Sequence, residues 1–392
     1  MMTPTPPDAP SPPPPPTGND TVWPSQASDA DSSPGGPAGG AFGETALDSI
    51  STAVAHRIAR FVDAQVAELQ ALDPALERLG AAIADLVDAG GKRLRPAFVY
   101  WGHRATGADH DDAVFTPAAA VELVHAFALI QDDVMDRSPT RRGAPAAYVA
   151  FAAAHEDAAH RGDAAWFGVS AAILAGDLAT AWAARLFDEA DFPVEVMTRA
   201  RRVFVDLRTE VIAGQYLELW HTGRDADEHD ALRVGLLKSG RYTVTRPLLL
   251  GAALGGADSE LEDALTAYGD AIGVAFQLRD DILGLYGDPE LTGKSTLDDL
   301  REGKQTLLMV WALQRADAAD RTTLDRLLGN EAATPADVEM VGDIVRRTGA
   351  LDDVVQLLDE RRITAHQALA RIGDPARGAL TDLGDLALER TT

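Results

Sequence analysis

The stretch VELVHAFALIQDDVMD, residues 121–136, decides the fold class of this chain. Residues 121–130 would be apolar nearly all round a helix, which is typical of a helix buried inside a helical bundle. Three aspartates, Asp132, Asp133 and Asp136, close the stretch. Because Asp132 and Asp136 are four residues apart, a helix places their carboxylates on one face, with Asp133 about 100° round it.

Three neighbouring carboxylates predict a positive partner. Like charges repel at this spacing, and Pro139 soon ends the helix, where the backbone dipole also disfavours negative charge. Hard divalent cations such as Mg²⁺ take carboxylate oxygens as ligands and are completed by water and substrate phosphates. The sequence therefore favours a metal site over the alternative, a solvated helix end.

A second acidic cluster, Asp280 and Asp281, repeats the arrangement about 150 residues later. It also follows an apolar run, residues 272–278, that indicates a buried helix. The pair of clusters predicts a helical bundle with a central, metal-lined cavity.

Two basic turns supply the opposite charge. In residues 90–96, GGKRLRP, two glycines break the preceding helix and a proline suits the first turn of the next. The exposed N–H groups of that helix start, with Lys92 and Arg95, would bind a phosphate group. Arg141 and Arg142 form the second turn. In a chain with 35 Lys and Arg against 61 Asp and Glu, a net charge of −26, these focused cations indicate anion sites rather than ordinary surface loops.

Residues 1–44 differ from the rest of the chain in composition. They hold 12 of the 22 prolines, with mostly small or polar residues between them and no Lys or Arg. Such a segment cannot bury a core, so we predict a disordered Pro/Gly/Ser-rich tail with local polyproline II structure. A passive tail is favoured over a PxxP ligand for a partner, and the segment has neither a secretory nor a transit signal.

Residues 45–392 are predicted to form a single all-α domain. Apolar residues recur at helical spacing, and neither a convincing strand nor a short repeat is found. Glycines and prolines break the pattern at 90–91, 138–139, 255–256 and 287–289. The expected helices include 46–72, 95–105, 114–137, 164–189, 193–220, 229–253, 258–286, 297–316 and 348–371.

The composition narrows the class of protein further. Without cysteine there is no disulfide, thiolate metal site or iron–sulfur cluster, which is compatible with a cytoplasmic location. The acidic balance argues against nucleic acid as a partner. No apolar run approaches the roughly 18 uninterrupted residues that span a membrane, so no transmembrane segment is expected.

Three motifs in this order resemble those of the trans-isoprenyl diphosphate synthases, also called polyprenyl synthetases. They are GGKRLRP at 90–96, DDVMD at 132–136 followed by RRG at 141–143, and FQLRDD at 276–281. The resemblance covers roughly residues 45 to 385. It implies an all-α isoprenoid-synthase bundle that joins isopentenyl diphosphate to an allylic diphosphate with two to three Mg²⁺ ions, or Mn²⁺ in their place. It also implies a homodimer.

The resemblance assigns roles to single residues. Asp132, Asp136 and Asp280 would hold the metal ions. Asp133 and Asp281 would support them, and Asp281 is also assigned as a metal ligand. The diphosphate that leaves would accept the final proton, so no protein base is required. Isopentenyl diphosphate would be bound by Lys92, Arg95, His125 and Arg142. The allylic diphosphate would be faced by Arg141, Lys238, Ser239, Gln277, Lys294 and Lys304, of which Lys238 is also assigned a catalytic role.

Each assignment has a plainer alternative. His125 could be a satisfied core histidine, although it lies two helical turns before Asp132 on nearly the same face. Lys238 could be an ordinary cation at a helix end, and Lys294 and Lys304 could be ordinary cations of surface loops.

Three positions depart from the family pattern. Gly284 stands where the second motif usually has a third aspartate, which affects the tightness of one metal site. Gln131 replaces the histidine that commonly precedes the first motif, and Ser239 keeps the hydroxyl of the usual threonine.

The helix before the first motif predicts the product length. Phe127 lies five residues before Asp132, roughly 7.5 Å along a helix, so its ring could close the pocket for the growing chain. Ordinary core packing is the alternative. A bulky residue here beside the small Ala128, without an insertion in the motif, resembles the geranylgeranyl-producing pattern, and Val124 is included as a chain-length position. We expect mainly C20 geranylgeranyl diphosphate, with C15 as the second choice.

Two other functions compete with prenyl-chain elongation from dimethylallyl, geranyl or farnesyl diphosphate. A class I terpene cyclase shares the bundle and the first motif but needs no second diphosphate site, so Lys92 and Arg95 argue against it. In a noncatalytic subunit of a heteromeric synthase, aspartates of the first motif are usually replaced, whereas DDVMD is intact here. The sequence therefore favours the prenyltransferase.

Overall fold

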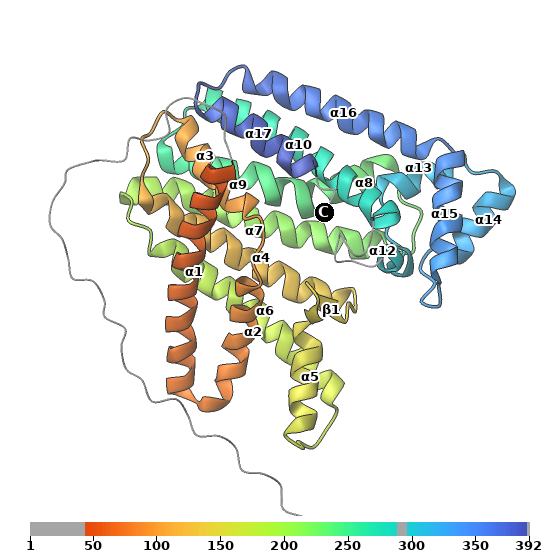
Figure 1. Ribbon diagram of the computed structural model, residues 1–392, viewed down its shortest axis with the longest axis horizontal. Coiled ribbons are helices and arrows are strands. Elements are labelled where there is room, and N and C mark those ends of the chain that lie inside the picture. Colours follow the sequence, from red (N-terminus) through yellow and green to blue (C-terminus); the bar gives the residue numbers. More distant parts are fainter. Residues whose placement is uncertain (1–43, 288–295, 390–392) are drawn as a thin grey trace, which may run out of the picture. The chain divides into compact units, whose positions relative to one another are not determined.

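The fold is all-α, as predicted (Figure 1). The computed structural model describes residues 44–287 and 296–389. The predicted tail, residues 1–44, lies outside these residues except for Glu44, and the division of the chain there stays a prediction. Within the described residues, the N-terminal helices and short helical turns are α1 (Glu44–Leu72), η1 (Pro74–Leu76), α2 (Glu77–Asp88), α3 (Leu94–Ala105), η2 (Asp112–Val114), α4 (Phe115–Met135), α5 (Ala147–Asp157), α6 (Ala164–Asp188) and α7 (Val194–His221).

A small antiparallel hairpin interrupts the helices. It pairs β1 (Thr140–Arg141) with β2 (Ala144–Pro145) and lies directly after the first acidic motif. The remaining elements are α8 (Glu228–Gly235), η3 (Leu236–Thr245), α9 (Arg246–Gly255), α10 (Ser259–Tyr286), α12 (Thr296–Glu302), α13 (Leu307–Arg315), α14 (Ala318–Leu327), α15 (Pro335–Arg347), α16 (Ala350–Leu369) and α17 (Ala376–Leu388).

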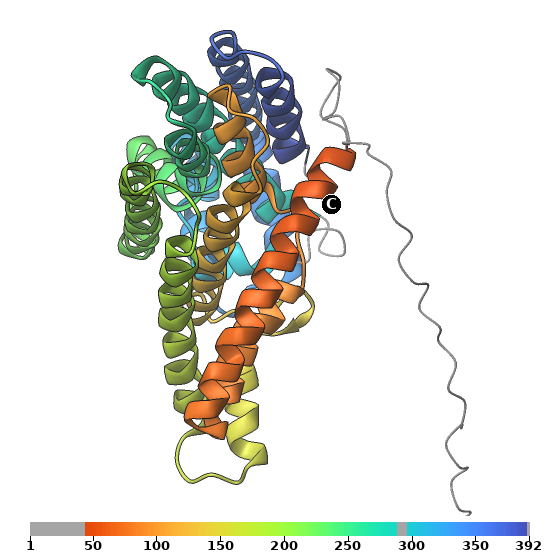
Figure 2. The same cartoon turned by 90° about the vertical axis from the view of Figure 1, so that its left-hand side faces the viewer.

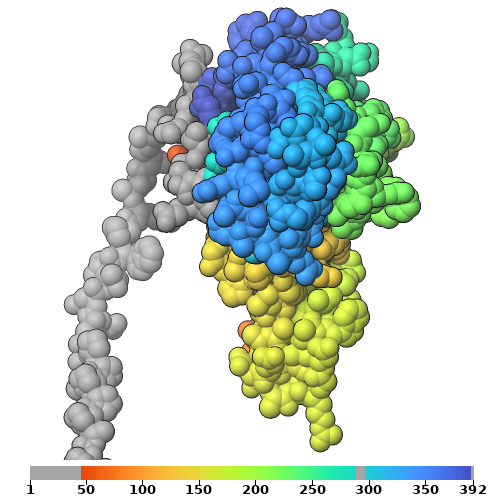
Figure 3. All heavy atoms as spheres, turned by 90° about the vertical axis from the view of Figure 1, so that its right-hand side faces the viewer, coloured from red at the N-terminus to blue at the C-terminus, as the bar shows by residue number. Residues whose placement is uncertain are grey.

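Helix α4 runs through the larger hydrophobic core. Most of its side chains are buried, and it packs along α6 and also against α1 and α3. A second core joins the end of α10 to α12, α13, α15 and α16 through side chains such as Ile282 and Val341. Figure 3 shows residues of α14 to α16 (blue) covering one end of the bundle, above the residues around α5 (yellow-green). Both acidic motifs therefore extend from well-packed helices.

The expected helix 229–253 is observed as one continuous helical segment, which divides into α8, η3 and α9. Between α8 and α9 the chain winds as a π-helix, η3, a form that is frequently found at functional sites. Two close backbone approaches hold η3 in place. A β-carbon on Gly214 of α7 would lie 2.6 Å from the Cα of Lys238, and one on Gly240 would lie 2.8 Å from the carbonyl carbon of Gly273. Glycine is required at these contacts, which fix η3 between α7 and α10.

The expected helix 297–316 is wrong, because two helices replace it. Helix α12 ends at Glu302, and Gly303 follows it with a φ of 69°, in the left-handed region that glycine adopts readily. Helix α13 starts at Leu307, where the Thr306 side chain accepts a hydrogen bond from the Met309 N–H. The interruption places Lys304 beside the first acidic motif. Helices α2, α5, α14, α15 and α17 were not among the expected ranges.

Two helical segments are long and apolar enough to cross a membrane, judged by length and composition alone. The segment Asp112–Met135 contains α4 and is mostly buried in the core, whereas the apolar window of Ala164–Asp188, α6, is only 28% buried. Neither helix is an uninterrupted apolar run, because each contains polar residues. Core helices often pass the same test, so the finding is weak evidence for a membrane span.

Candidate active site

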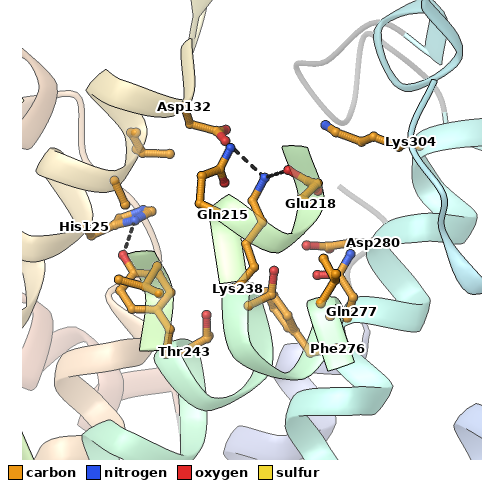
Figure 4. Close-up of a pocket in the computed structure, with 18 of the residues that line it drawn as sticks. His125, Asp132, Gln215, Glu218, Lys238, Thr243, Phe276, Gln277, Asp280 and Lys304 are labelled. Atoms are coloured by element: carbon orange, nitrogen blue, oxygen red, sulfur yellow. Dashed lines mark hydrogen bonds and ion pairs between the residues drawn. The ribbon is translucent and has the colours of Figure 1, made fainter. Parts of the chain in front are cut away.

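A cavity of about 760 Å³ opens between α4, α7, η3 and α10. Its lining includes residues of both acidic motifs and of both basic turns, which lie far apart in the sequence. Figure 4 shows Asp132 and Asp280 reaching into it from different helices, with Lys238 between them. The tertiary fold therefore brings the predicted motifs to one place.

Three carboxylates form the acidic end of the site. Asp132 and Asp136 come from the end of α4, and Glu218 comes from α7. One oxygen of each lies within 4.8 Å of the others, an arrangement that could hold a metal ion. Burial, together with the neighbouring Asp132, raises the pKa of Asp136. Asp132 and Asp136 of DDVMD thus lie together, and Glu218 is an addition that the sequence did not single out.

Lys238 neutralises part of this acidic end. Its ammonium nitrogen lies 3.1 Å from Oδ1 of Asp132 and also forms an ion pair with Glu218 (Figure 4). Burial alone would lower the pKa of Lys238, but the two carboxylates outweigh it and raise the pKa. Lys238 is therefore a charged group between the carboxylates of Asp132 and Glu218.

Lys304 is a second cation on the same cluster. Its ammonium lies 3.5 Å from Asp136, 3.2 Å from Asp299, and pairs with Glu302. Burial would lower the pKa of Lys304, but Asp299 and the other carboxylates raise it well above its usual value. Burial also raises the pKa of Glu302 to about 7, against the lowering effect of Lys304.

Asp133 has a different environment from its two neighbours. Its carboxylate is buried and accepts hydrogen bonds from the Arg141 guanidinium, with Nε at 2.8 Å. The same guanidinium lies 3.7 Å from Asp132. Asp133 thus fixes Arg141 at the cavity wall, which fits the supporting role expected for it.

The second acidic motif also divides into two roles. Asp280 and Asp281 both line the cavity, but Asp281 is only 8% exposed and accepts a 2.6 Å hydrogen bond from the Gln277 amide. Burial raises the pKa of Asp281 to about 8; the Gln277 hydrogen bond lowers it, and Asp299 and Asp280 raise it further. Burial thus favours the protonated form of the Asp281 carboxyl group.

The basic end of the cavity is built around Tyr242. The Tyr242 hydroxyl and Nδ1 of His125 are hydrogen-bonded at 2.8 Å. The Arg95 guanidinium stacks 4.4 Å from the centre of the Tyr242 ring and donates a 3.0 Å hydrogen bond to Thr243. Burial, reinforced by Arg95 and Arg142, lowers the pKa of His125 well below its usual value. His125 is therefore a neutral hydrogen-bonding group, and Tyr242 and Thr243 were not predicted.

The cations of the two basic turns differ in exposure. Arg93 is buried in an ion pair with Glu122 and serves the fold, whereas Lys92 is exposed at the rim of the cavity. Arg142 donates a 3.2 Å hydrogen bond to the Leu86 carbonyl and another to Gly90. Lys92, Arg95, His125 and Arg142 all line the cavity, and their role as a second anion site stays a prediction.

The remaining predicted residues are placed as follows. Ser239 and Gln277 line the cavity, and Lys294 lies outside the described residues. Phe127 and Ala128 also line it, but Val124 is fully buried in the core and is not part of the wall. Val124 precedes Phe127 by three residues, about one helical turn further from the acidic motif, and its side chain is fully buried there.

Some functional candidates carry weak sequence signals. Tyr242 follows Lys238 by four residues, so a helix would place both on one face. Glu218 lies in an expected helix, but a single glutamate there is ordinary, and only the packing of α7 on η3 brings it to Lys238. Asp299 belongs to none of the three sequence motifs.

Comparison with known proteins identifies the family. The fold is all-α, and one cavity holds residues of two acidic motifs and opposing cations. Residues 76–345 match the polyprenyl synthetase family, and this chain belongs to that family.

Curated and structural relatives agree with this membership. Geranylfarnesyl diphosphate synthase of Aeropyrum pernix is 35% identical over 74% of this chain and 86% of its own length. Geranylgeranyl diphosphate synthase of Methanosarcina mazei is 33% identical over 88% of this chain and 98% of its own. A crystal structure of geranylgeranyl pyrophosphate synthase from Corynebacterium glutamicum, complexed with isoprenyl diphosphate and magnesium, has a TM-score of 0.84 and 36% identity over 88% of this chain and 99% of its own. The predicted family and the enzyme class are confirmed.

Proposed function

We propose that this enzyme is a Mg²⁺-dependent prenyltransferase that condenses isopentenyl diphosphate with an allylic diphosphate, mainly to geranylgeranyl diphosphate. One observation carries the proposal. A single cavity has two ends of opposite character. The acidic end contains the Asp132 and Glu218 carboxylates with the Lys238 ammonium between them, and the separate basic end lies around Arg95 and His125. Two anionic substrates need two such subsites, whereas a terpene cyclase needs one.

The acidic end fits Mg²⁺ by its donor chemistry. Asp132, Asp136 and Glu218 offer carboxylate oxygens within 4.8 Å of one another, and Mg²⁺ prefers oxygen ligands. We assign two to three ions to these residues together with Asp280 and Asp281, with Mn²⁺ as a substitute. Bound magnesium neutralises the charge of a leaving diphosphate.

The side chains of the acidic end would stabilise bond breaking. Lys238, Lys304 and Arg141 would bind oxygens of the allylic diphosphate, together with Ser239 and Gln277. As the C–O bond of the allylic substrate breaks, negative charge grows on these oxygens, and preorganised cations stabilise it. Each cation is already held by carboxylates, so little reorganisation is needed.

The side chains of the basic end would orient the second substrate. Lys92, Arg95 and Arg142 would hold the diphosphate of isopentenyl diphosphate, and neutral His125 would add a hydrogen bond. The double bond of this substrate attacks the allylic cation, a C–C bond forms, and a proton passes to the released diphosphate. Apolar residues of the wall, such as Phe276, would exclude water from the cation.

Product length would follow from the depth of the apolar part of the cavity. Phe127 and Ala128 line it, and the Phe127 ring is 8% exposed, so it borders the cavity from the core side. We assign Phe127 as the floor that limits the chain to C20, with C15 as the second choice. Of the two curated relatives, the geranylgeranyl diphosphate synthase is named for the C20 product and the geranylfarnesyl diphosphate synthase for the next longer one.

We further propose a homodimer formed through α6 and α7, which works in the cytoplasm, where charged diphosphates dissolve. Large apolar side chains are exposed on both helices, among them Ile173, Leu174, Val205 and Trp220. Both helices lie on the same side of the bundle (Figure 2). Large exposed apolar patches commonly mark protein interfaces. Light scattering should therefore give twice the chain mass, and Leu174→Glu, which leaves the cavity lining unchanged, should shift it toward the monomer.

The test of the reaction is direct. Purified enzyme with Mg²⁺ and labelled isopentenyl diphosphate is offered dimethylallyl, geranyl or farnesyl diphosphate in turn, and the dephosphorylated alcohols are sized by chromatography. We expect linear products, mainly C20, and no turnover with EDTA. Release of diphosphate and a cyclic hydrocarbon from geranylgeranyl diphosphate alone would establish the cyclase instead.

A further inference from the structure

We propose that Arg241 is a positioning residue, which bridges α7 and α10 and so keeps the π-helix η3 in the place from which Lys238 reaches the acidic end of the cavity. Arg241 lies on η3 but does not line the cavity. Because Lys238 belongs to the site of the proposed function, this role of Arg241 rests on that function. The bridge itself consists of contacts within the fold and is measurable without any substrate.

The Arg241 guanidinium joins two helices. Its Nε and Nη2 donate hydrogen bonds of 3.2 Å and 2.9 Å to the two carboxylate oxygens of Asp270 on α10. Its third nitrogen, Nη1, lies 3.4 Å from Oε1 of Glu210 on α7. All three side chains are less than one-third exposed, and bidentate pairs of this kind are among the stronger hydrogen bonds. One side chain of η3 therefore uses all its nitrogens to hold both neighbouring helices, and we call these contacts the Arg241 bridge.

The two carboxylates of the bridge are themselves fixed. The Arg246 guanidinium, at the start of α9, donates hydrogen bonds of 2.8 Å and 2.6 Å to Glu210. On the other side, Oδ1 of Asp270 accepts a 2.8 Å hydrogen bond from the Thr245 hydroxyl at the end of η3. A β-carbon on Gly269, beside Asp270, would lie 2.7 Å from the Cα of Thr245, so the backbone of η3 lies directly on α10 there.

The winding of η3 makes such a bridge important. Hydrogen bonds of a π-helix span five residues, as from the Arg246 N–H to the Arg241 carbonyl, and this winding is rare. The close approaches at Gly214 and Gly240 let α7 and α10 touch the backbone of η3. Contacts of this kind limit how near the helices come, but they do not tie them together. The ion pairs of Arg241 supply that attraction.

The position of Lys238 depends on the position of η3. Lys238 lies three residues before Arg241, and its ammonium is 3.1 Å from Asp132 and also pairs with Glu218. Glu210 and Glu218 are eight residues apart on α7, so two cations of η3 bind α7 at points about two turns apart. A shift of η3 along α7 would break both contacts. Loss of the Arg241 bridge therefore alters the acidic end without removing any group from the cavity.

Amide hydrogen exchange of the metal-free full chain tests the bridge, because it needs neither substrate nor turnover. Arg241→Gln removes the ion pairs, and Arg241→Lys keeps the charge but loses the fork of nitrogens. Arg347→Gln is the matched control, since Arg347 donates hydrogen bonds of 3.2 Å and 2.6 Å to the two oxygens of Asp320 and so joins α15 to α14. Circular dichroism and thermal midpoints check that each variant folds.

The exchange of residues 236–245 gives the first result. It should be about tenfold faster in Arg241→Gln than in the natural chain, the scale expected when a strong charge-assisted pair is lost. Arg241→Lys should come within about threefold of Arg241→Gln, because one ammonium cannot bind both carboxylates in this geometry. Arg347→Gln should leave this segment unchanged. Equal exchange in Arg241→Gln and Arg347→Gln, or natural exchange in Arg241→Lys, would overturn the bridge.

Steady-state kinetics below all thermal midpoints give the second result. Arg241→Gln should lower kcat about tenfold and leave both KM values within about threefold, since the contact of Lys238 with the leaving group strengthens in the transition state. A role in stability alone would leave kcat of the folded enzyme unchanged. In a Lys238→Met background, Arg241→Gln should cost no more than about a further twofold, because the two residues are coupled.

Two kinetic outcomes would overturn the positioning role. One is an unchanged kcat in Arg241→Gln, and the other is a full tenfold further loss in the Lys238→Met background, which would show that Arg241 acts independently of Lys238. A natural chain that condenses no isoprenoid would refute the proposed function, whereas the exchange of residues 236–245 decides the Arg241 bridge in either case.

Discussion

The Lys238 ammonium lies 3.1 Å from the Asp132 carboxylate although 106 residues separate them in the sequence. The pair joins the π-helix η3 to the end of α4, and Glu218 of α7 binds the same ammonium. Because both carboxylates are also candidate metal ligands, the ammonium and a bound cation would share them. The arrangement predicts that the stability of the metal-free protein depends on Lys238.

Lys238→Met should destabilise the metal-free protein by about 3 kcal/mol, because it leaves buried carboxylates without their partner. Added Mg²⁺ should raise the thermal midpoint more in this variant than in the natural chain. Turnover at saturating Mg²⁺ should fall at least about a hundredfold, since a cation that stabilises the leaving group is lost. Arg201→Met, which breaks a half-exposed ion pair with Asp188, is the control and should cost less than about 1 kcal/mol. Equal midpoints of Lys238→Met and the natural chain without metal would contradict this role.

Asp132→Ala and Asp280→Ala should each lower kcat by about a hundredfold or more, which corresponds to roughly 3–4 kcal/mol of lost transition-state stabilisation. The fold should stay intact, because removing one of several repelling carboxylates does not create a cavity in the core. Asp263→Ala, on the exposed side of α10, is the matched control. Steady-state kinetics at saturating Mg²⁺ decide the matter, and near-normal turnover in either variant would favour a solvated helix end.

Phe127→Ala should lengthen the product beyond C20, because Phe127 borders the cavity and its ring would no longer close it. Val124→Ala, three residues earlier on α4, should leave the product unchanged, since Val124 lies in the core. Chromatography of the dephosphorylated alcohols measures both. If the two variants give the same product distribution as the natural chain, Phe127 is only a core residue.

The stability of the metal-free protein should fall as the pH rises toward about 8. Burial raises the pKa of Asp281 from 3.8 to about 8, so the folded protein holds a proton there that the unfolded chain releases above about pH 4. This contribution is fully present below the unfolded pKa and is lost as the pH passes through the folded one. Asp281→Asn cannot ionise and should flatten the dependence, measured as thermal midpoints in EDTA between about pH 5 and pH 8. An unchanged slope in Asp281→Asn would place the titrating group elsewhere.

Much of the site was predictable because it is encoded locally. Asp132 and Asp136 share a helix face by their spacing, and the apolar residues before them predict a buried helix. Lys92 and Arg95 follow a helix break that two glycines create. Short-range patterns of this kind need no knowledge of how the helices pack.

The sequence alone thus determined the all-α class, the two acidic motifs and the basic turns that oppose them. The tertiary structure decided which carboxylates share the site. Glu218 joins Asp132 only because α7 packs on η3, and Asp299 reaches Gly284 only because α12 lies beside α10. These contacts depend on backbone approaches between distant segments, such as that of Gly214 to Lys238, and helical periodicity carries no information about them.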